Sequence, residues 1–190
     1  MPLTLLPPNA ATRMPWKNGR GSTLELASDA RAGQPWTWRV SIADVPESGP
    51  FSIFDGCDRE IACLEGDGMR LVVDGVPHDV PHEGRACAFS GNAETSGVLL
   101  GGPCRDANLM WRRDAWQGGL VLYRGACTFE GAADVSVVHV VRGAATVNGR
   151  SLAQGMSAIA TGEKLHVAGD GLVMVAELKK KVEKGEWRGA

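Results

Sequence analysis

Apolar and polar residues alternate over short segments of this chain, which is the pattern of half-buried β-strands. The clearest alternation runs over residues 36–43 and places two sets of side chains on opposite faces of one strand. The apolar face carries Trp36, Trp38, Val40 and Ile42. The other face carries Thr37, Arg39, Ser41 and Ala43. Further strands are predicted by apolar runs at 71–73, 97–100, 120–123, 135–141 and 172–176.

Helical patterns are rare in this sequence. Residues 106–116 suit one short helical piece. Asp106 and Asn108 are then expected to cap it, with polar contacts to a ligand as the alternative. The chain is therefore predicted to be all-β with few short helices.

A repeat divides the chain into two similar halves. Residues 61–89 contain a strand, a glycine, a strand ending at Asp74-Gly75, and a further strand after another glycine. Residues 138–160 repeat this order around Asn148-Gly149. Asp-Gly and Asn-Gly favour tight hairpins because glycine readily accepts a positive φ. The repeat predicts two antiparallel barrels of the jelly-roll type found in cupins.

This repeat also suggests how the chain is divided. We expect an N-terminal barrel with its preceding segment at 1–115 and a mainly structural C-terminal barrel at 116–180. Residues 181–190 are expected to form a polar tail.

Composition narrows the class of protein. The chain has 190 residues, of which 44% are hydrophobic and 22% charged, with a net charge of −2, values ordinary for a globular protein. No broad basic field favours nucleic acid as a partner, and no apolar run approaches the ~20 residues that span a bilayer. Five cysteines without a CxxC pair, behind an N-terminus unlike a signal peptide, favour free thiols and a cytoplasmic location.

Two segments combine glycine-set backbone with polar side chains between apolar ones, which favours a pocket for a small polar ligand. The first is Met14-Pro15-Trp16-Lys17-Asn18-Gly19, and the second is Gly49-Pro50-Phe51-Ser52, followed by Asp58-Arg59. A simple core is a poor explanation for them, because buried Lys, Asn or Arg side chains must find partners.

These two segments, together with Trp38–Ala43 and Asp106–Met110, resemble the HutD/Ves family over about residues 5–178. The resemblance implies a bacterial bicupin, with two cupin barrels in one chain. It also implies a link to histidine utilisation, where binding of a pathway intermediate such as N-formylglutamate would govern flux; the Ves branch is linked to cold or environmental stress. One departure is Arg20, which stands where the family usually has a third glycine and adds a cation near the site.

Histidine spacing argues against a metal centre. A metal-dependent cupin needs two closely spaced histidines, a carboxylate and a later histidine, and residues 49–66 contain no histidine. His78 and His82 are four apart, but Pro77 and Pro81 disfavour a helical ligand pair. No metal and no cofactor are therefore predicted. His139, in an apolar strand, is kept as a weak candidate that would point into the second barrel.

Arginine side chains are the main candidates for recognising a ligand. The planar guanidinium of Arg59 can clamp a carboxylate through two hydrogen bonds, and the alternative is an ion pair with Asp55, Asp58 or Glu60. Arg39 and Ser41 share a strand face that either lines the barrel interior, which the resemblance favours, or faces solvent.

Four other residues complete the predicted binding set with Asp58. Lys17 would supply a compact charge and Asn18 a donor and an acceptor, although Asn-Gly also favours a plain turn. Phe51 and Trp16 would form an apolar wall, or belong to the core.

The sequence therefore predicts metal-independent binding of a small carboxylate metabolite. A rival is a metal-free cupin enzyme, an isomerase or hydrolase using Glu25, Asp55 or Asp58 as a base. A third hypothesis is a structural or partner-binding module, for which exposed edge strands would also allow a homodimer.

Overall fold

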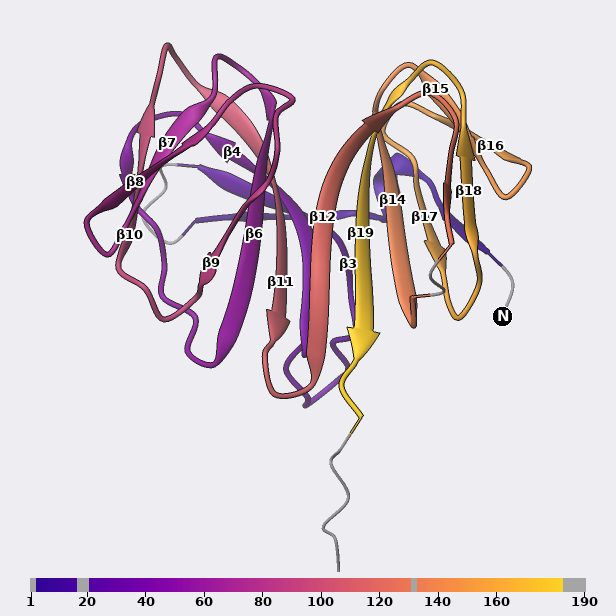
Figure 1. Ribbon diagram of the computed structural model, residues 1–190, viewed down its shortest axis with the longest axis horizontal. Coiled ribbons are helices and arrows are strands. Elements are labelled where there is room, and N and C mark those ends of the chain that lie inside the picture. The colour runs from indigo at the N-terminus through magenta and orange to yellow at the C-terminus, as the bar shows by residue number, and fades with distance from the viewer. Residues whose placement is uncertain (1–2, 17–20, 131–132, 183–190) are drawn as a thin grey trace, which may run out of the picture.

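In the computed structural model, four antiparallel sheets form two barrels that stand side by side (Figure 1). The structure describes residues 3–16, 21–130 and 133–182. The only helical segment in these ranges is the three-residue 3-10 helix η1 (Pro8–Ala10), so no helix there is long and apolar enough to cross a bilayer.

The N-terminal barrel packs a six-stranded sheet against a four-stranded one. The order of the larger sheet is β2 (Thr12–Pro15), β3 (Ser22–Ser28), β4 (Trp38–Val45), β11 (Cys104–Arg112), β6 (Cys57–Glu65) and β9 (Cys87–Ser90). The order of the smaller is β5 (Gly49–Pro50), β10 (Thr95–Leu99), β7 (Met69–Val73) and β8 (Val76–Val80).

The C-terminal barrel pairs a five-stranded sheet with a four-stranded one. The larger has the order β1 (Thr4–Leu6), β17 (Ser157–Ala160), β14 (Val135–Arg142), β19 (Leu172–Lys180) and β12 (Trp116–Arg124). The smaller has the order β13 (Cys127–Phe129), β18 (Leu165–Ala168), β15 (Ala144–Val147) and β16 (Arg150–Ala153).

The first strand crosses between the two halves. β1 pairs antiparallel with β17, so Thr4–Leu6 extend the C-terminal barrel rather than the segment 1–115 in which the repeat placed them. Leu5 packs against the core of that second barrel. A strand of three residues is too short for its sequence pattern to predict which strand it pairs with.

Both hairpins predicted from the repeat are present. Asp74 and Gly75 have φ values of 48° and 81°, and Asn148 and Gly149 have 46° and 76°. Two successive positive φ values match the right-handed twist of the flanking strands, which is why Asp-Gly and Asn-Gly suit these positions.

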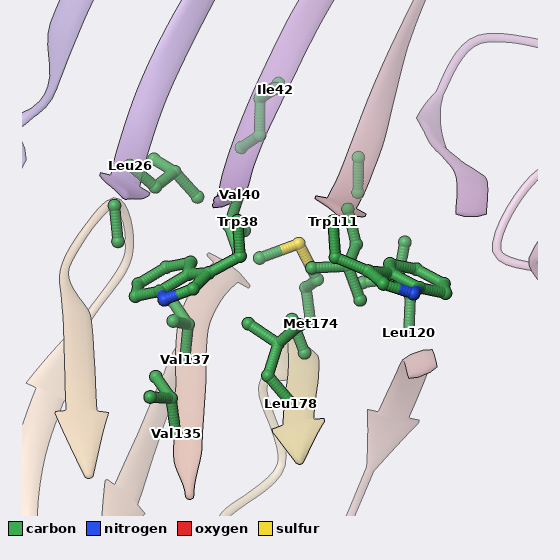
Figure 2. Packing of buried hydrophobic residues seen from close by; sticks show 14 of the residues in the cluster. Leu26, Trp38, Val40, Ile42, Trp111, Leu120, Val135, Val137, Met174 and Leu178 are labelled. Carbon is green, nitrogen blue, oxygen red and sulfur yellow. The ribbon is translucent and has the colours of Figure 1, made fainter. Parts of the chain in front are cut away.

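A large core lies between the two barrels. Trp38, Val40 and Trp111 of the six-stranded sheet pack towards Met174 and Leu178 of the five-stranded sheet (Figure 2). The alternation predicted at 36–43 is thus correct for Trp38, Val40 and Ile42. Trp36 precedes the strand, which begins at Trp38 and continues to Val45, and its ring lies against Phe54.

The predicted short helix is wrong. Asp106 lies in β11, and Trp116 begins β12 after a turn. β11 is a central strand buried on both faces: Ala107, Leu109 and Trp111 enter the core between the barrels. Strand pairing on both sides therefore decided the conformation of this segment, and no helix exists for Asp106 or Asn108 to cap.

Candidate functional site

A cavity of about 670 Å³ opens in the N-terminal barrel. Its floor is the inner face of β4, β11 and β6, and its walls include Trp16 and the segment 47–52. Side chains alternate between the two faces of a strand. Arg39 and Ser41 of β4 and Asp106 and Asn108 of β11 alternate with residues of the core between the barrels, and all four line the cavity.

Strand register arranges the floor in rows. Arg39, Met110 and Arg59 are cross-strand neighbours on β4, β11 and β6. The next row pairs Ser41 with Asn108, and the row after it pairs Ala43 with Asp106. The two cations thus share one end of the floor, and the acid lies at the other.

Arg59 lies inside an aromatic cage. Its side chain is 5% exposed, and its guanidinium carbon is 5.6, 5.3 and 5.1 Å from the ring centroids of Phe51, Phe54 and Phe89. Nη1 donates to the Ser52 carbonyl at 3.2 Å, but Nε has no partner among the described residues. Burial lowers the pKa of Arg59 to about 10, so the group remains a cation at neutral pH.

The ion pair predicted as the alternative for Arg59 is wrong, because each proposed acid is engaged elsewhere. Asp55 accepts a hydrogen bond from Asn92 at 2.8 Å, and Glu60 accepts one from the Leu120 backbone N–H at 2.6 Å. Asp58 accepts a hydrogen bond from Arg113 Nε at 3.0 Å.

Asp58, which the sequence placed in the binding set, does not line the cavity. It follows Cys57 and precedes Arg59 on β6, so its side chain leaves the opposite face of the sheet from that of Arg59 and is absent from the cavity lining. The same placement removes Asp58 as the base of an enzyme in this cavity. Asp55 likewise does not line it.

Arg39 and Ser41 are on the cavity side of β4. Ser41 is 2% exposed. Arg39 Nε lies 3.3 Å from Glu25 Oε2, yet it makes no hydrogen bond within the described part of the chain. Burial lowers the pKa of Arg39, and the charge of Glu25 opposes this effect.

Trp16 and Phe51 both line the cavity, as the apolar-wall hypothesis requires. Trp16 Nε1 donates to Thr23 Oγ1 at 2.9 Å, which fixes the indole. A Cβ at Gly21 would lie 2.7 Å from the Trp16 ring, so this glycine allows the ring its place. Lys17 and Asn18 lie outside the described residues.

Asp106, which the sequence assigned to a helix cap with contact to a ligand as the alternative, lines the cavity. It is 1% exposed, and its Oδ1 has no hydrogen-bond partner among the described residues. Burial raises the pKa of Asp106 to about 7, although the positive charge of Arg59 acts against the rise. Its charge is therefore poised to change near neutral pH.

Asn108 occupies the middle of the floor. It is 8% exposed, and its Oδ1 also lacks a partner within the described ranges. A buried polar group without a partner costs about 1–3 kcal/mol. The signal that could have found both residues is the two-residue period of Asp106, Asn108 and Met110 between the apolar neighbours.

His139 does not point into the second barrel, contrary to the expectation. Val138 and Val140 face that interior, so His139 is on the opposite face of β14, with Nδ1 2.9 Å from Ser157 Oγ. Burial lowers its pKa to about 4, which leaves the ring neutral. Among the described residues, no group of three or more His, Cys, Asp or Glu side chains is placed to hold a metal ion.

Sequence comparison identifies relatives of this chain. The HutD family model matches residues 9–183. An uncharacterised 21.2 kDa protein in the hutC 3′ region of Pseudomonas putida is 46% identical over 124 residues, which is 65% of both chains. Protein Ves of Citrobacter koseri is 35% identical over 101 residues, 52% of both chains. The matched stretches thus span less than two thirds of these curated relatives.

Solved structures agree with the family and the fold. HutD from Pseudomonas fluorescens SBW25, in a formate condition, superposes with a TM-score of 0.85 at 32% identity, covering 95% of this chain and 100% of that one. A bacterial pirin from Escherichia coli, at 15% identity and a TM-score of 0.66, shares the fold over 95% of this chain and 100% of its own. The all-β bicupin prediction is confirmed, and the chain belongs to the HutD family.

Proposed function

We propose that the protein binds a small carboxylate metabolite in the cavity of its N-terminal barrel, without a metal ion. The observation that carries this proposal is Arg59, a buried cation with an unpartnered Nε and no carboxylate within ion-pair distance among the described residues. Taking a charge out of water is costly unless a partner compensates it. A bound carboxylate would supply that partner through charge-assisted hydrogen bonds.

The surroundings of Arg59 favour binding of an anion. Phe51 and Phe54 keep water from the guanidinium, and lower local polarity strengthens an ion pair formed there. Arg39 lies two strands away on the same row, and its charge is partly offset by Glu25, whose Oε2 is 3.3 Å from Arg39 Nε.

The family suggests which carboxylate to test first. HutD proteins are linked to the histidine-utilisation region, and one relative lies beside hutC. We therefore propose an intermediate of histidine breakdown, such as N-formylglutamate, as the ligand whose binding governs the pathway.

A second candidate function rests on Asp106. An acid with a pKa of about 7 inside a ligand cavity is suited to proton transfer, so a metal-free isomerase or hydrolase is the rival. Asp106 would act as its acid or base in place of Glu25, Asp55 and Asp58, none of which lines the cavity.

Thermal melting of the metal-stripped protein tests the proposal. The panel contains N-formylglutamate, formate, urocanate, glutamate and histidine, with sugars and phosphates as controls. We expect one carboxylate to raise the melting temperature by at least about 5 °C at a hundredfold excess over its Kd, because it binds only the folded state.

The same samples separate binding from catalysis. After incubation, proton NMR should find the stabilising carboxylate unchanged; a new product that depends on Asp106 would favour the enzyme. No shift with any carboxylate would overturn the proposed function, and a large shift with zinc or iron alone would overturn its metal independence.

A further inference from the structure

The floor of the cavity carries arginine donors at one end and, further along, side-chain oxygens without a partner among the described residues. At the first row, Arg39 and Arg59 offer only N–H donors, since a guanidinium has no acceptor. Two residues further along β11 lies Asn108, and two further lies Asp106. At ~3.4 Å per residue, the rows are roughly 7 Å apart, so the floor matches a ligand several bonds long.

The unpartnered atoms follow the same order. Arg39 Nε and Arg59 Nε are donors without a hydrogen bond, and Asn108 Oδ1 and Asp106 Oδ1 are acceptors without one, all within the described part of the chain. Asn108 and Asp106 are more than nine-tenths buried and both line the cavity. Buried polar atoms in folded proteins are nearly always satisfied, so the bound state has to supply partners for both kinds of atom.

A carboxylate group can satisfy only half of this set. Its oxygens accept from the arginines and can accept from Asn108 Nδ2, but it has no N–H or O–H to offer to the Oδ1 atoms of Asn108 and Asp106, which lack a partner within the described ranges. When Asp106 is ionised, above its pKa of about 7, a second carboxylate placed there would bring acceptor against acceptor and negative charge against negative charge. A neutral amide N–H or a hydroxyl would instead match both oxygens.

We propose that the ligand carries, a few bonds from a carboxylate, a neutral N–H or O–H donor that Asn108 and Asp106 recognise. This inference rests on the proposed carboxylate-binding function and narrows its ligand class to amides, N-acyl amino acids and hydroxy acids. Simple carboxylates that lack such a donor are then weak ligands, and the acceptor end of the floor is the specificity determinant.

Matched pairs of small acids test this inference by isothermal titration calorimetry. Each pair joins a carboxylate by a chain of fixed length to either a primary amide or a methyl ester: succinamate with monomethyl succinate, glutaramate with monomethyl glutarate, and adipamate with monomethyl adipate. Both members carry a carbonyl acceptor, but only the amide carries a donor. For at least one length, we expect the amide to bind at least about tenfold more tightly, since sites built for a donor reject analogues that lack it.

Two variants test which residues cause the preference for the amide over the ester. Asn108→Leu removes both the acceptor and the donor of the amide at similar size. At about pH 8.5, where Asp106 is ionised, Asp106→Asn exchanges a charge-assisted acceptor for a weaker neutral one, so all titrations are run at this pH. We expect each to reduce the ratio of ester to amide Kd to less than about threefold, with folding checked by a cooperative melt. Asp58→Asn, on the other face of the sheet, is the matched control and should keep the wild-type ratio.

The outcomes separate the inference from the function on which it rests. Equal binding of amide and ester at every length, with affinity still dependent on Arg59, overturns the donor requirement and leaves carboxylate binding intact. If both Asn108→Leu and Asp106→Asn still prefer the amide, these two residues do not recognise the donor of the ligand. Absence of binding by all six acids also overturns the inference, whereas the proposed function falls only if the wider carboxylate panel gives no shift.

Discussion

Replacing Arg59 by methionine should weaken carboxylate binding by at least about a hundredfold, while the free energy of unfolding stays the same or rises. The loss follows from the position of the guanidinium, which is buried at the cavity and has an unpartnered Nε. Without Arg59, a bound carboxylate would be desolvated with no bidentate donor beside it.

The free energy of unfolding should not fall in Arg59→Met, because the cage around this side chain is apolar. Phe51, Phe54 and Phe89 surround a charge that burial already disfavours, as its lowered pKa indicates. Methionine has a similar length, adapts to irregular space and contacts aromatic rings favourably. Substitution of a buried charge by an apolar side chain is often neutral or stabilising.

Calorimetric titration with the carboxylate that gives the largest thermal shift measures the first effect, and urea unfolding measures the second. Asp58→Asn is the matched control: it alters the neighbouring residue, whose half-exposed pair with Arg113 faces away from the cavity. It should change affinity by less than about twofold and stability by less than about 1 kcal/mol. Unchanged affinity in Arg59→Met would remove Arg59 from the binding site.

The variant Asp106→Asn should remove a large pH dependence of stability. In the folded protein Asp106 keeps its proton up to about pH 7, whereas in the unfolded chain it loses it near pH ~3.9. Between these values the folded state binds more protons, so the free energy of unfolding falls as pH rises. A difference of ~3 pKa units corresponds to a loss of up to roughly 4 kcal/mol.

Asparagine does not titrate, so the variant lacks this contribution. We expect the stability of Asp106→Asn relative to wild type to increase by up to roughly 4 kcal/mol between about pH 4 and pH 8. Cys63 is the cross-strand neighbour of Asp106, and its pKa is lowered mainly by a hydrogen bond with Cys104. The charge of Cys63 adds to the effect of burial in raising the pKa of Asp106. Urea unfolding at a series of pH values measures the difference. A difference that does not vary with pH would show that folding does not raise the pKa of Asp106.

The sequence alone established the fold and part of the site, for local reasons. Alternation with a period of two follows from strand geometry, so the two faces around Trp38 and Arg39 could be read directly. Asp74-Gly75 and Asn148-Gly149 specify hairpins because few residues accept a positive φ, and their repetition indicated two barrels. Arg59 stood out because a cation beside a buried strand needs a partner.

The position of Asp58 outside the cavity could have been predicted from the sequence. Adjacent residues on a strand point to opposite faces, so Asp58 and Arg59 could not both line one cavity. Once Arg59 was chosen, this rule would have excluded Asp58.

Only the tertiary structure decided the remaining features. β11 is buried on both faces, so its apolar residues do not form a half-exposed pattern, and its pairing with β4 and β6 brought Asp106 and Asn108 into the cavity that Arg59 lines. β1 joined the C-terminal barrel through three backbone pairings, which its side chains do not encode. Strand order and cross-barrel packing are non-local: they depend on energies shared between segments far apart in the chain, and no short window of sequence contains them.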